Sequence, residues 1–470
     1  MQFWFAFGCL AVASVCAEQR KAYKVETFVE PRYVEKKTST FQESGQRAIY
    51  MMAGLVPIPV IYTYMDAHSY IRPGGDERPI GVSTQVGVDN KLQLDFWSEP
   101  SLVRSTDIRV SPTAYRSVMD MMKEAGLSPD IRHSDVQSLI DKEQEKMTEA
   151  RKMSPYASKD IESEYLTFPE IEEFLNELAA EFPDRVEKSS IGKSVEGRDL
   201  IKIRVASNLA DTSKPVIWIE AMTHAREWIT GASALYTIRR LARQQDREAI
   251  DMLDQYDWYF APVHNPDGYV YSHTTDRMWR KNRKEQNECS WWGCYTCYGT
   301  DLNRNWDVSW AGEGTSPYCD HDTYHGVKAF SEPETANLRD AIMSTPNRKA
   351  FFSIHSYSEL IMIPNGYIRT KPDDYDEVKR VADAAQKALK AIHGKSYRVG
   401  TPPDILYAAT GGAFDYMRTR DGPNLKWSYT YELRPADAEH GGFVLDTKWI
   451  LPTAEELFAS LNSFAYEIAK

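Results

Sequence analysis

The segment Val216-Ile-Trp-Ile219 is continuously apolar, and His224-Ala-Arg-Glu227 follows it closely. A strand that is apolar at every position is typical of a sheet covered on both faces. Similar runs occur at Tyr256–Val263, Ala350–Ile354 and Trp427–Leu433. Helical patterns separate the runs, at Ile229–Ala242, Glu332–Met343, Asp374–Ile392 and Ala454–Ile468. This alternation predicts an α/β fold in which helices flank a largely buried central sheet.

The N-terminal part of the chain has a different pattern and predicts a second, smaller domain. The length of 470 residues also exceeds one ordinary domain. Short strand-like segments occur at Tyr23–Val29, Leu92–Trp97 and Asp107–Val110. With the helices described next, they favour a small α+β sandwich. Residues 36–87 fit neither pattern, and we interpret them as a long loop.

Capping signals place two helices in this smaller domain. The first covers residues 112–126, with Ser111 as N-cap, proline at the first helical position and glycine at the end. The second begins at Ser134, because Ser134 and Gln137 have the spacing of a capping box. It ends in the basic pair Arg151-Lys152. An exposed basic pair is a natural cleavage site for a trypsin-like protease.

The domain boundary follows that basic pair. Thr167 and Glu170 again have capping-box spacing and predict a helix that continues to about Ala180. From there onward the α/β pattern dominates. We therefore predict a small domain over residues 18–152 and a large domain over residues 153–470.

Residues 1–17 have the features of a signal peptide, with a buried N-terminal strand as the alternative. An apolar stretch from Phe3 to Val15 ends in the small-residue pattern Val15-Cys16-Ala17. We expect cleavage after Ala17 and a secreted, extracellular protein. The apolar run Met51–Tyr64 is too short to span a membrane. A net charge of −12, with no long basic block, argues against nucleic-acid or acidic-membrane binding.

Cysteine usage agrees with secretion. Two of the six cysteines lie within residues 1–17, and the other four crowd into one stretch, at Cys289, Cys294, Cys297 and Cys319. In an oxidising compartment this pattern favours disulfides within a long loop. The C-x-x-C spacing of Cys294 and Cys297 leaves a zinc site as the less favoured alternative.

Metal-competent side chains follow three predicted strands. They are His224, His355 and Glu432, and His224 forms an H-x-x-E motif with Glu227. Open α/β sheets bind ligands at the carboxyl ends of their strands. Two histidines and one glutamate with an open fourth position are typical of catalytic zinc, whereas a structural zinc has four protein ligands. Three unrelated buried polar groups are the alternative.

Other metal and hydrolase motifs are weaker or missing. His321 and His325 are spaced as a rival ligand pair, but they lie in a polar loop, where surface or hydrogen-bonding roles are more typical. The sequence contains no H-E-x-x-H motif and no G-x-S-x-G motif. These motifs therefore give no support to a zincin helix or a serine-hydrolase elbow.

Several motifs together resemble the metallocarboxypeptidase A/B family, in order and in spacing. They are Thr223-His-Ala-Arg-Glu-Trp-Ile229, Asn265-Pro-Asp-Gly-Tyr269, Arg277-Met-Trp-Arg-Lys281, Asp301-Leu-Asn-Arg-Asn-Trp306, Ser353-Ile-His-Ser-Tyr-Ser358 and Tyr431-Glu-Leu-Arg-Pro435. Two upstream segments are similar to that family's activation segment, Leu92-Gln-Leu-Asp-Phe-Trp97 and Asp135-Val-Gln-Ser-Leu-Ile140. The resemblance covers nearly all of the chain except residues 36–87. It implies a mixed sheet of the carboxypeptidase type and residues 18–152 as an activation domain.

The resemblance also implies a role for each matched residue. It implies one zinc ion per chain, bound by His224, Glu227 and His355, and a disulfide between Cys297 and Cys319, which leaves Cys289 and Cys294 for an extra bridge. Asp301 matches the carboxylate that orients the first histidine, Glu432 the general base, and Arg280 the residue that polarises the scissile carbonyl. Asn303, Arg304 and Tyr407 match the clamp on the substrate's free carboxylate, and Arg226 matches an outer-subsite residue. The base would activate a zinc-bound water whose pKa the metal lowers to about 7.

Specificity follows from the residue matched by Phe414. Enzymes of the B type carry an acidic residue there, which pairs with a terminal Lys or Arg. The matched pocket lining contains no charge, and its residues are Met362, Gly366, Ala409, Gly412, Phe414 and Thr430. We therefore expect an A-type enzyme that favours aliphatic and moderate aromatic termini.

The leading hypothesis is a secreted, monomeric proenzyme that a trypsin-like protease activates and that cleaves peptide or protein C-termini. A catalytically dead homologue that only binds such termini is one alternative, although every matched position carries a competent residue. A partner-binding role for residues 18–152 is another.

Overall fold

The computed structural model describes residues 60–63, 94–101, 104–124, 126–153, 160–290, 293–420 and 425–470. The chain divides into two compact units, Met1–Leu55 and Val56–Lys470, and every described residue belongs to the second. The predicted signal peptide and the predicted strand Tyr23–Val29 lie outside the described residues. No described helix is long and apolar enough to cross a membrane.

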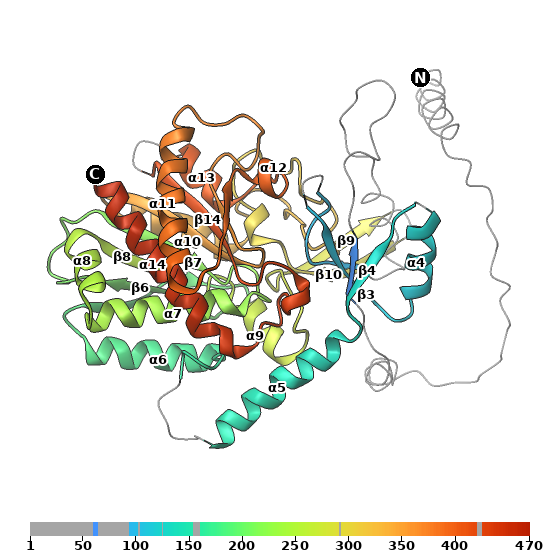
Figure 1. The fold of residues 1–470 in the computed structure, drawn as a ribbon, viewed down its shortest axis with the longest axis horizontal. Helices are drawn as coiled ribbons and strands as arrows, with labels where there is room; N and C mark the ends of the chain where they lie inside the picture. Colours follow the sequence, from blue (N-terminus) through green and yellow to red (C-terminus); the bar gives the residue numbers. More distant parts are fainter. Residues whose placement is uncertain are drawn as a thin grey trace. The chain divides into compact units, whose positions relative to one another are not determined.

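An eight-stranded mixed sheet lies within the residues predicted as the large domain, in the order β13-β12-β14-β11-β7-β8-β6-β5 (Figure 1). Its four inner strands, β14, β11, β7 and β8, pair in parallel. The pairs β12–β14, β6–β8 and β5–β6 are antiparallel. The strands are β5 (Val186–Lys193), β6 (Asp199–Val205), β7 (Val216–Ala221), β8 (Asp257–Ala261), β11 (Arg348–Ser356), β12 (Leu360–Met362), β13 (Arg398–Gly400) and β14 (Trp427–Leu433). The predicted mixed, buried sheet is confirmed.

Helices cover both faces of this sheet because consecutive strand residues point to opposite sides. On β11, Phe352 packs into a core with α6, α7, α8, α11 and α14, whereas Phe351 packs into a second core with α10 and α13. Both phenylalanines are fully buried. The helices are α6 (Phe168–Glu181), α7 (Trp228–Arg243), α8 (Arg247–Gln255), α10 (Pro333–Ser344), α11 (Tyr375–His393), α13 (Ala413–Arg420) and α14 (Ile450–Ala469).

A second sheet lies within the residues predicted as the small domain; it is four-stranded and antiparallel, in the order β2-β3-β1-β4. Strand β1, Val60–Thr63, pairs with both β3 and β4, so the interpretation of residues 36–87 as a loop is wrong at this strand. Pro57 and Pro59 interrupt the apolar run Met51–Tyr64 just before this strand and obscure it in the sequence, although proline is tolerated at strand starts. The other elements are β2 (Leu94–Phe96), β3 (Thr106–Val110), β4 (Pro129–His133), α4 (Tyr115–Glu124) and α5 (Val136–Met153).

The caps of α5 and α6 show one wrong and one confirmed prediction. Helix α5 is capped by Asp135, whose Oδ1 accepts from the backbone N–H of Ser138 at 3.1 Å. Ser134 is therefore not the N-cap, because the neighbouring carboxylate takes that place. At α6 the predicted capping box is confirmed, and the N–H of Thr167 donates to Oε2 of Glu170 at 2.7 Å.

A disulfide-bonded hairpin, β9 (Glu285–Ser290) and β10 (Gly293–Tyr298), was not predicted. The predicted disulfide Cys297–Cys319 is confirmed. Cys294 is also disulfide-bonded, and the hairpin register pairs it with Cys289. The C-x-x-C motif is therefore not a zinc site. The remaining elements are α9 (Pro266–Thr274), α12 (Pro402–Ile405), η3 (Leu302–Arg304), η4 (Ala438–His440) and η5 (Thr447–Trp449).

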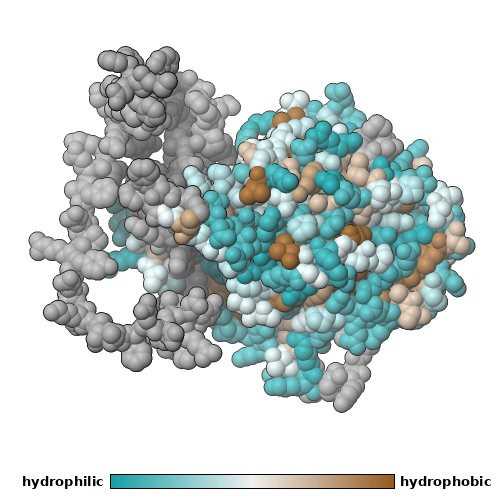
Figure 2. Space-filling view, turned by 180° about the vertical axis from the view of Figure 1, so that it is seen from behind, coloured by the Kyte–Doolittle hydropathy of each residue, from teal (hydrophilic) through white to brown (hydrophobic). Residues whose placement is uncertain are grey.

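The coloured surface on the face in Figure 2 is largely hydrophilic, and its hydrophobic residues lie in small separate patches. Val327 and Tyr466 are among the exposed large hydrophobic residues of the molecule. Scattered apolar residues of this kind are ordinary on protein surfaces.

Candidate active site

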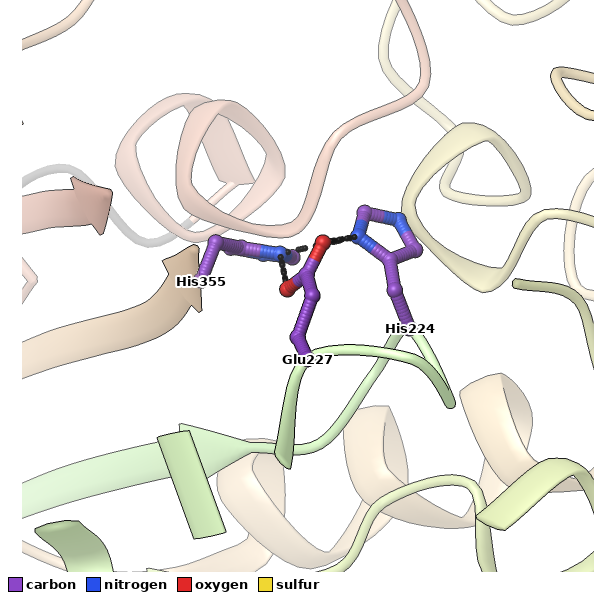
Figure 3. Close-up of side chains that lie close together, drawn as sticks. All are labelled: His224, Glu227 and His355. Atoms are coloured by element: carbon purple, nitrogen blue, oxygen red, sulfur yellow. Dashed lines mark hydrogen bonds and ion pairs between the residues drawn. The ribbon is translucent and has the colours of Figure 1, made fainter. Parts of the chain in front are cut away.

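Three predicted metal ligands converge at the carboxyl edge of the central sheet (Figure 3). His224 and Glu227 lie in the turn between β7 and α7, and His355 lies near the end of β11. Nδ1 of His224 lies 2.7 Å from Oε1 of Glu227, and Nδ1 of His355 lies 3.1 Å from Oε2. The two Nδ1 atoms are 3.1 Å apart. All three residues are buried, and their ligand atoms lie within 4.8 Å of one another.

The outer ring nitrogens have separate partners, which fixes the direction of each imidazole. Nε2 of His224 lies 3.1 Å from Oδ1 of Asp301, and Nε2 of His355 lies 2.8 Å from Oγ of Ser353. Both Nδ1 atoms therefore face the centre of the cluster. Burial lowers the pKa of His355. Burial opposes ionisation of Glu227, but the two histidines outweigh it and lower the pKa of that carboxyl group.

The donor set fits a zinc ion. Two imidazoles and a carboxylate that is ionised at neutral pH are ordinary zinc ligands, and three protein ligands leave a fourth position open. A carboxylate behind a ligating histidine, as Asp301 is here, typically orients the ring. Among the described residues this is the one group of three or more candidate ligands that converges in this way.

The carboxylate of Asp301 binds Arg280 as well as His224. Its Nη2 and Nε donate to Oδ2 of Asp301 at 2.8 and 3.1 Å. Burial opposes ionisation of Asp301, but Arg280 and His224 outweigh it and hold the pKa of Asp301 well below its ordinary range. A guanidinium group is thereby placed beside the candidate metal site.

A polar group suited to a carboxylate lies beside this site. Nη2 of Arg304 donates to the hydroxyl of Tyr407 at 3.2 Å, and its Nε donates to the carbonyl of Gly314 at 2.9 Å. Asn303 is held by the backbone N–H of Ala413, which donates to its Oδ1 at 2.9 Å. Asn303, Arg304 and Tyr407 line one cavity with His224 and Glu227.

Glu432 lines the same cavity, from the end of β14. It is register partner to His355 on β11, so the strand pairing brings the two together. Burial and the nearby Glu227 raise the pKa of Glu432 well above its ordinary value. A carboxyl group with a raised pKa is suited to accept and return protons.

Phe414, Gly366 and Thr430 also line the cavity. A Cβ atom on Gly366 would lie 2.9 Å from Cζ of Phe414 and 2.8 Å from Oδ2 of Asp415. The phenylalanine ring therefore lies directly against the glycine backbone. The carboxyl group of Asp415 accepts from the N–H of Gly366 at 2.9 Å, and burial raises its pKa to about 7.

Side chains from the predicted small domain also line this cavity, which sequence reasoning missed. Trp97, Ser98 and Arg104 line it. Nη1 of Arg226, the matched outer-subsite residue, donates to Oδ1 of Asp95 at 3.0 Å, and also to Asp322. These contacts join residues far apart in the chain, and no local signal indicates them.

The rival histidines do not form a metal site. Nδ1 of His321 lies 3.2 Å from the backbone N–H of Thr323, and Nδ1 of His325 lies 2.8 Å from the carbonyl of Gly326. Both rings thus have hydrogen-bond partners within their own loop.

Comparison with known proteins settles the family. Residues 171–460 match the model of the family described as zinc carboxypeptidase, and residues 87–143 match the model described as carboxypeptidase activation peptide. The chain belongs to the zinc carboxypeptidase family. This zinc carboxypeptidase is 38% identical to rat carboxypeptidase A2, over 82% of its chain and 90% of the relative. It is 35% identical to bovine carboxypeptidase A1, over 83% of its own chain and 91% of that relative.

Solved structures agree with this assignment. The carboxypeptidase A from Helicoverpa armigera matches with a TM-score of 0.76 and 29% identity, over 88% of this chain and 98% of that one. The predicted A-type metallocarboxypeptidase with an activation segment and one zinc ion is confirmed.

Proposed function

We propose that the protein is a secreted, monomeric zymogen whose activated form releases single apolar residues from peptide C-termini. The observation that carries this proposal is that the candidate zinc ligands His224 and Glu227, which cluster with His355, line one cavity with Glu432, Arg280 and the Arg304 group. Family membership supports the metallocarboxypeptidase activity itself.

His224, Glu227 and His355 are the proposed zinc ligands. A bound zinc ion supplies a Lewis acid and lowers the pKa of a coordinated water to about 7. Glu432 takes the proton of the attacking water and returns it to the departing amine. Arg280 donates to the carbonyl oxygen of the scissile bond, where negative charge develops in the transition state.

Binding of a free carboxylate would make the enzyme an exopeptidase. The planar guanidinium of Arg304 can grip a carboxylate with two parallel hydrogen bonds, which an ammonium group cannot copy. Asn303 and Tyr407 would complete this clamp. A peptide bond within a chain presents no such carboxylate, so cleavage is restricted to the C-terminal bond.

Phe414 is proposed to select uncharged side chains. An unpaired Lys or Arg against its ring would lose hydration without gaining a partner, at a cost of several kcal/mol. Because the ring lies against Gly366, the space for the largest side chains is also reduced. A methylene difference is worth only about 1–3 kcal/mol in such a pocket, so preferences among apolar termini should be graded.

The small domain is proposed to keep the enzyme latent, with residues 18–152 as the activation domain and Met153 near the start of the active form. Its side chains line the cavity, and Arg226 is engaged by Asp95. The hydroxyl of Tyr357 also donates to Oδ2 of Asp107 at 2.6 Å. A peptide substrate would have to displace these groups.

The test is release of C-terminal residues before and after limited trypsin treatment. We expect little activity in the intact chain, strong activity after cleavage, and loss of that activity with a strong chelator. kcat/KM on matched peptides ending in Leu, Phe, Trp, Lys and Glu should be highest for the apolar termini. A preference for Lys, or full activity of the uncut chain, would contradict the proposal.

A further inference from the structure

Asn282 is a fully buried polar residue that joins the two segments carrying Arg280 and Asp301. Its side-chain Oδ1 accepts from the backbone N–H of Thr300 at 2.8 Å. Its backbone N–H donates to the carbonyl of Thr300 at 3.2 Å. Arg280 lies two residues before Asn282, and Asp301 directly follows Thr300. The backbone and the side chain of Asn282 thus together tie the segment that carries Arg280 to the segment that carries Asp301.

The other end of Asn282 is anchored on two buried carboxyl groups at the start of α10. Its Nδ2 donates to Oε2 of Glu332 at 2.8 Å and to Oε2 of Glu334 at 3.1 Å. Both glutamates are fully buried. Lys284 pairs with Glu332 at 3.1 Å, and the backbone N–H of Val195 donates to Oε1 of Glu334 at 2.9 Å. The amide is therefore held from both sides.

Only a carboxamide satisfies all these contacts. The position needs one acceptor toward Thr300 and an NH₂ group toward the two glutamates, which asparagine supplies. Burial raises the pKa of Glu334 to about 7, so below that pH the two glutamates do not both carry full charge. An ionised aspartate at this position would keep the acceptor toward Thr300 but could not donate to the two glutamates, as the NH₂ group of asparagine does.

We propose that Asn282 is a positioning residue, which holds the Arg280 segment against Asp301 so that the guanidinium group of Arg280 points where the reaction needs it. This inference rests on the proposed function, in which Arg280 donates to the scissile carbonyl. The guanidinium of Arg280 is oriented by two hydrogen bonds to Asp301, so its direction depends on how the two segments lie. A misplacement of about 1 Å in a catalytic group can lower a rate roughly 10²-fold.

The first test compares Asn282→Asp with Asn176→Asp in the trypsin-activated enzyme. Asn176 is exposed and bonded only on the surface, to Lys188 at 2.7 Å, so it is a matched control. For Asn282→Asp we expect kcat to fall roughly 10- to 100-fold, KM to change by less than about twofold, and zinc content to stay normal. A normal kcat, or a higher KM with an unchanged kcat, would overturn the proposal.

The second test places Asn282→Asp in an Arg280→Ala background. Because Asn282 acts through Arg280, the double variant should be little slower than Arg280→Ala alone, and the two losses should not add. Fully additive losses would refute the positioning role while leaving the proposed function intact. A normal kcat in Arg280→Ala would refute both. If Asn282→Asp does not fold, Asn282→Ser carries the same comparison, because its hydroxyl can still accept but cannot bridge to both glutamates.

Discussion

The predicted activation site lies at the end of α5, where Arg151 is bound to the large domain. Its Nε donates to Oε1 of Glu170 at 3.0 Å, and its Nη2 donates to Oε2 at 2.9 Å. A protease must unfold the segment that it cleaves and take a basic side chain into its own pocket. We therefore expect Glu170→Gln to accelerate activation by trypsin.

The size of this effect follows from the exposure of the pair. The side chains of Arg151 and Glu170 are 36% and 24% exposed, so solvent screens their attraction. Exposed pairs contribute about 0.2–1 kcal/mol, and a two-bonded guanidinium–carboxylate contact belongs near the upper end. A loss of about 1 kcal/mol of stabilising free energy raises the population in which the cleavage segment is unfolded about fivefold. The rate of cleavage should rise by the same factor when unfolding and refolding of this segment are fast compared with cleavage.

Solution pH should not hide the effect. Burial opposes ionisation of Glu170, but Arg151 and Thr167 outweigh it and lower its pKa to about 2. The stabilising effect of the pair is present above the ordinary pKa of the carboxyl group and is lost only as the pH falls toward that lowered value. The acceleration should therefore be the same at neutral and mildly acidic pH.

The measurement is the rate at which catalytic amounts of trypsin produce the new N-terminus, identified by sequencing. Glu170 also caps α6, so Thr167→Ala tests the cap by removing the hydroxyl group that donates to Oε2 of Glu170, while both carboxylate oxygens that bind Arg151 stay in place. Glu177→Gln, on an exposed position of the same helix, is the matched charge control. Equal rates for Glu170→Gln and the unaltered chain, or equal acceleration by either control, would refute the reasoning.

Three further predictions concern the metal, the base and the release of the activation domain. His355→Ala should lose most of its zinc by mass spectrometry, and full occupancy with normal turnover would contradict the ligand assignment. Glu432→Gln should keep zinc and bind substrate while kcat collapses; a near-normal kcat would reduce Glu432 to a buried strand-end residue. Burial raises the pKa of Glu143 on α5 despite its ion pair with Arg277. Binding of the activation domain is therefore strongest below the pKa that Glu143 has when the domain is released, and it weakens as the pH rises through the raised pKa of the bound state. The cleaved activation domain should thus inhibit the enzyme more strongly at about pH 5 than at about pH 8. Glu143→Gln should reduce this difference between the two pH values, whereas Glu145→Gln, at an exposed position, should not. Equal inhibition at both pH values would contradict this prediction.

Features set by neighbouring residues could be read from the sequence. The strand Val216–Ala221 has apolar side chains at five of its six positions, because both faces of the sheet are covered. The capping box of Thr167 and Glu170 is complete within four residues. The zinc motif could be predicted for a related reason, because its ligands follow strands that end at one edge of the sheet.

Features that join distant segments could not be read in this way. Strand β1 has a short and interrupted pattern, and it is stabilised as a strand by pairing with β3 and β4. Asp135 and Ser134 are both good caps, and only the path of the chain decided between them.

The sequence by itself determined the alternation of strands and helices, the order of the motifs and the chemical types available at the site. Only the tertiary structure decided which partners those groups have: Asp95 for Arg226, Glu143 for Arg277, and two glutamates for Asn282. The physical reason is distance along the chain. Local propensities act within a few residues, whereas these contacts form only after packing has brought together segments that lie about 50 or more residues apart.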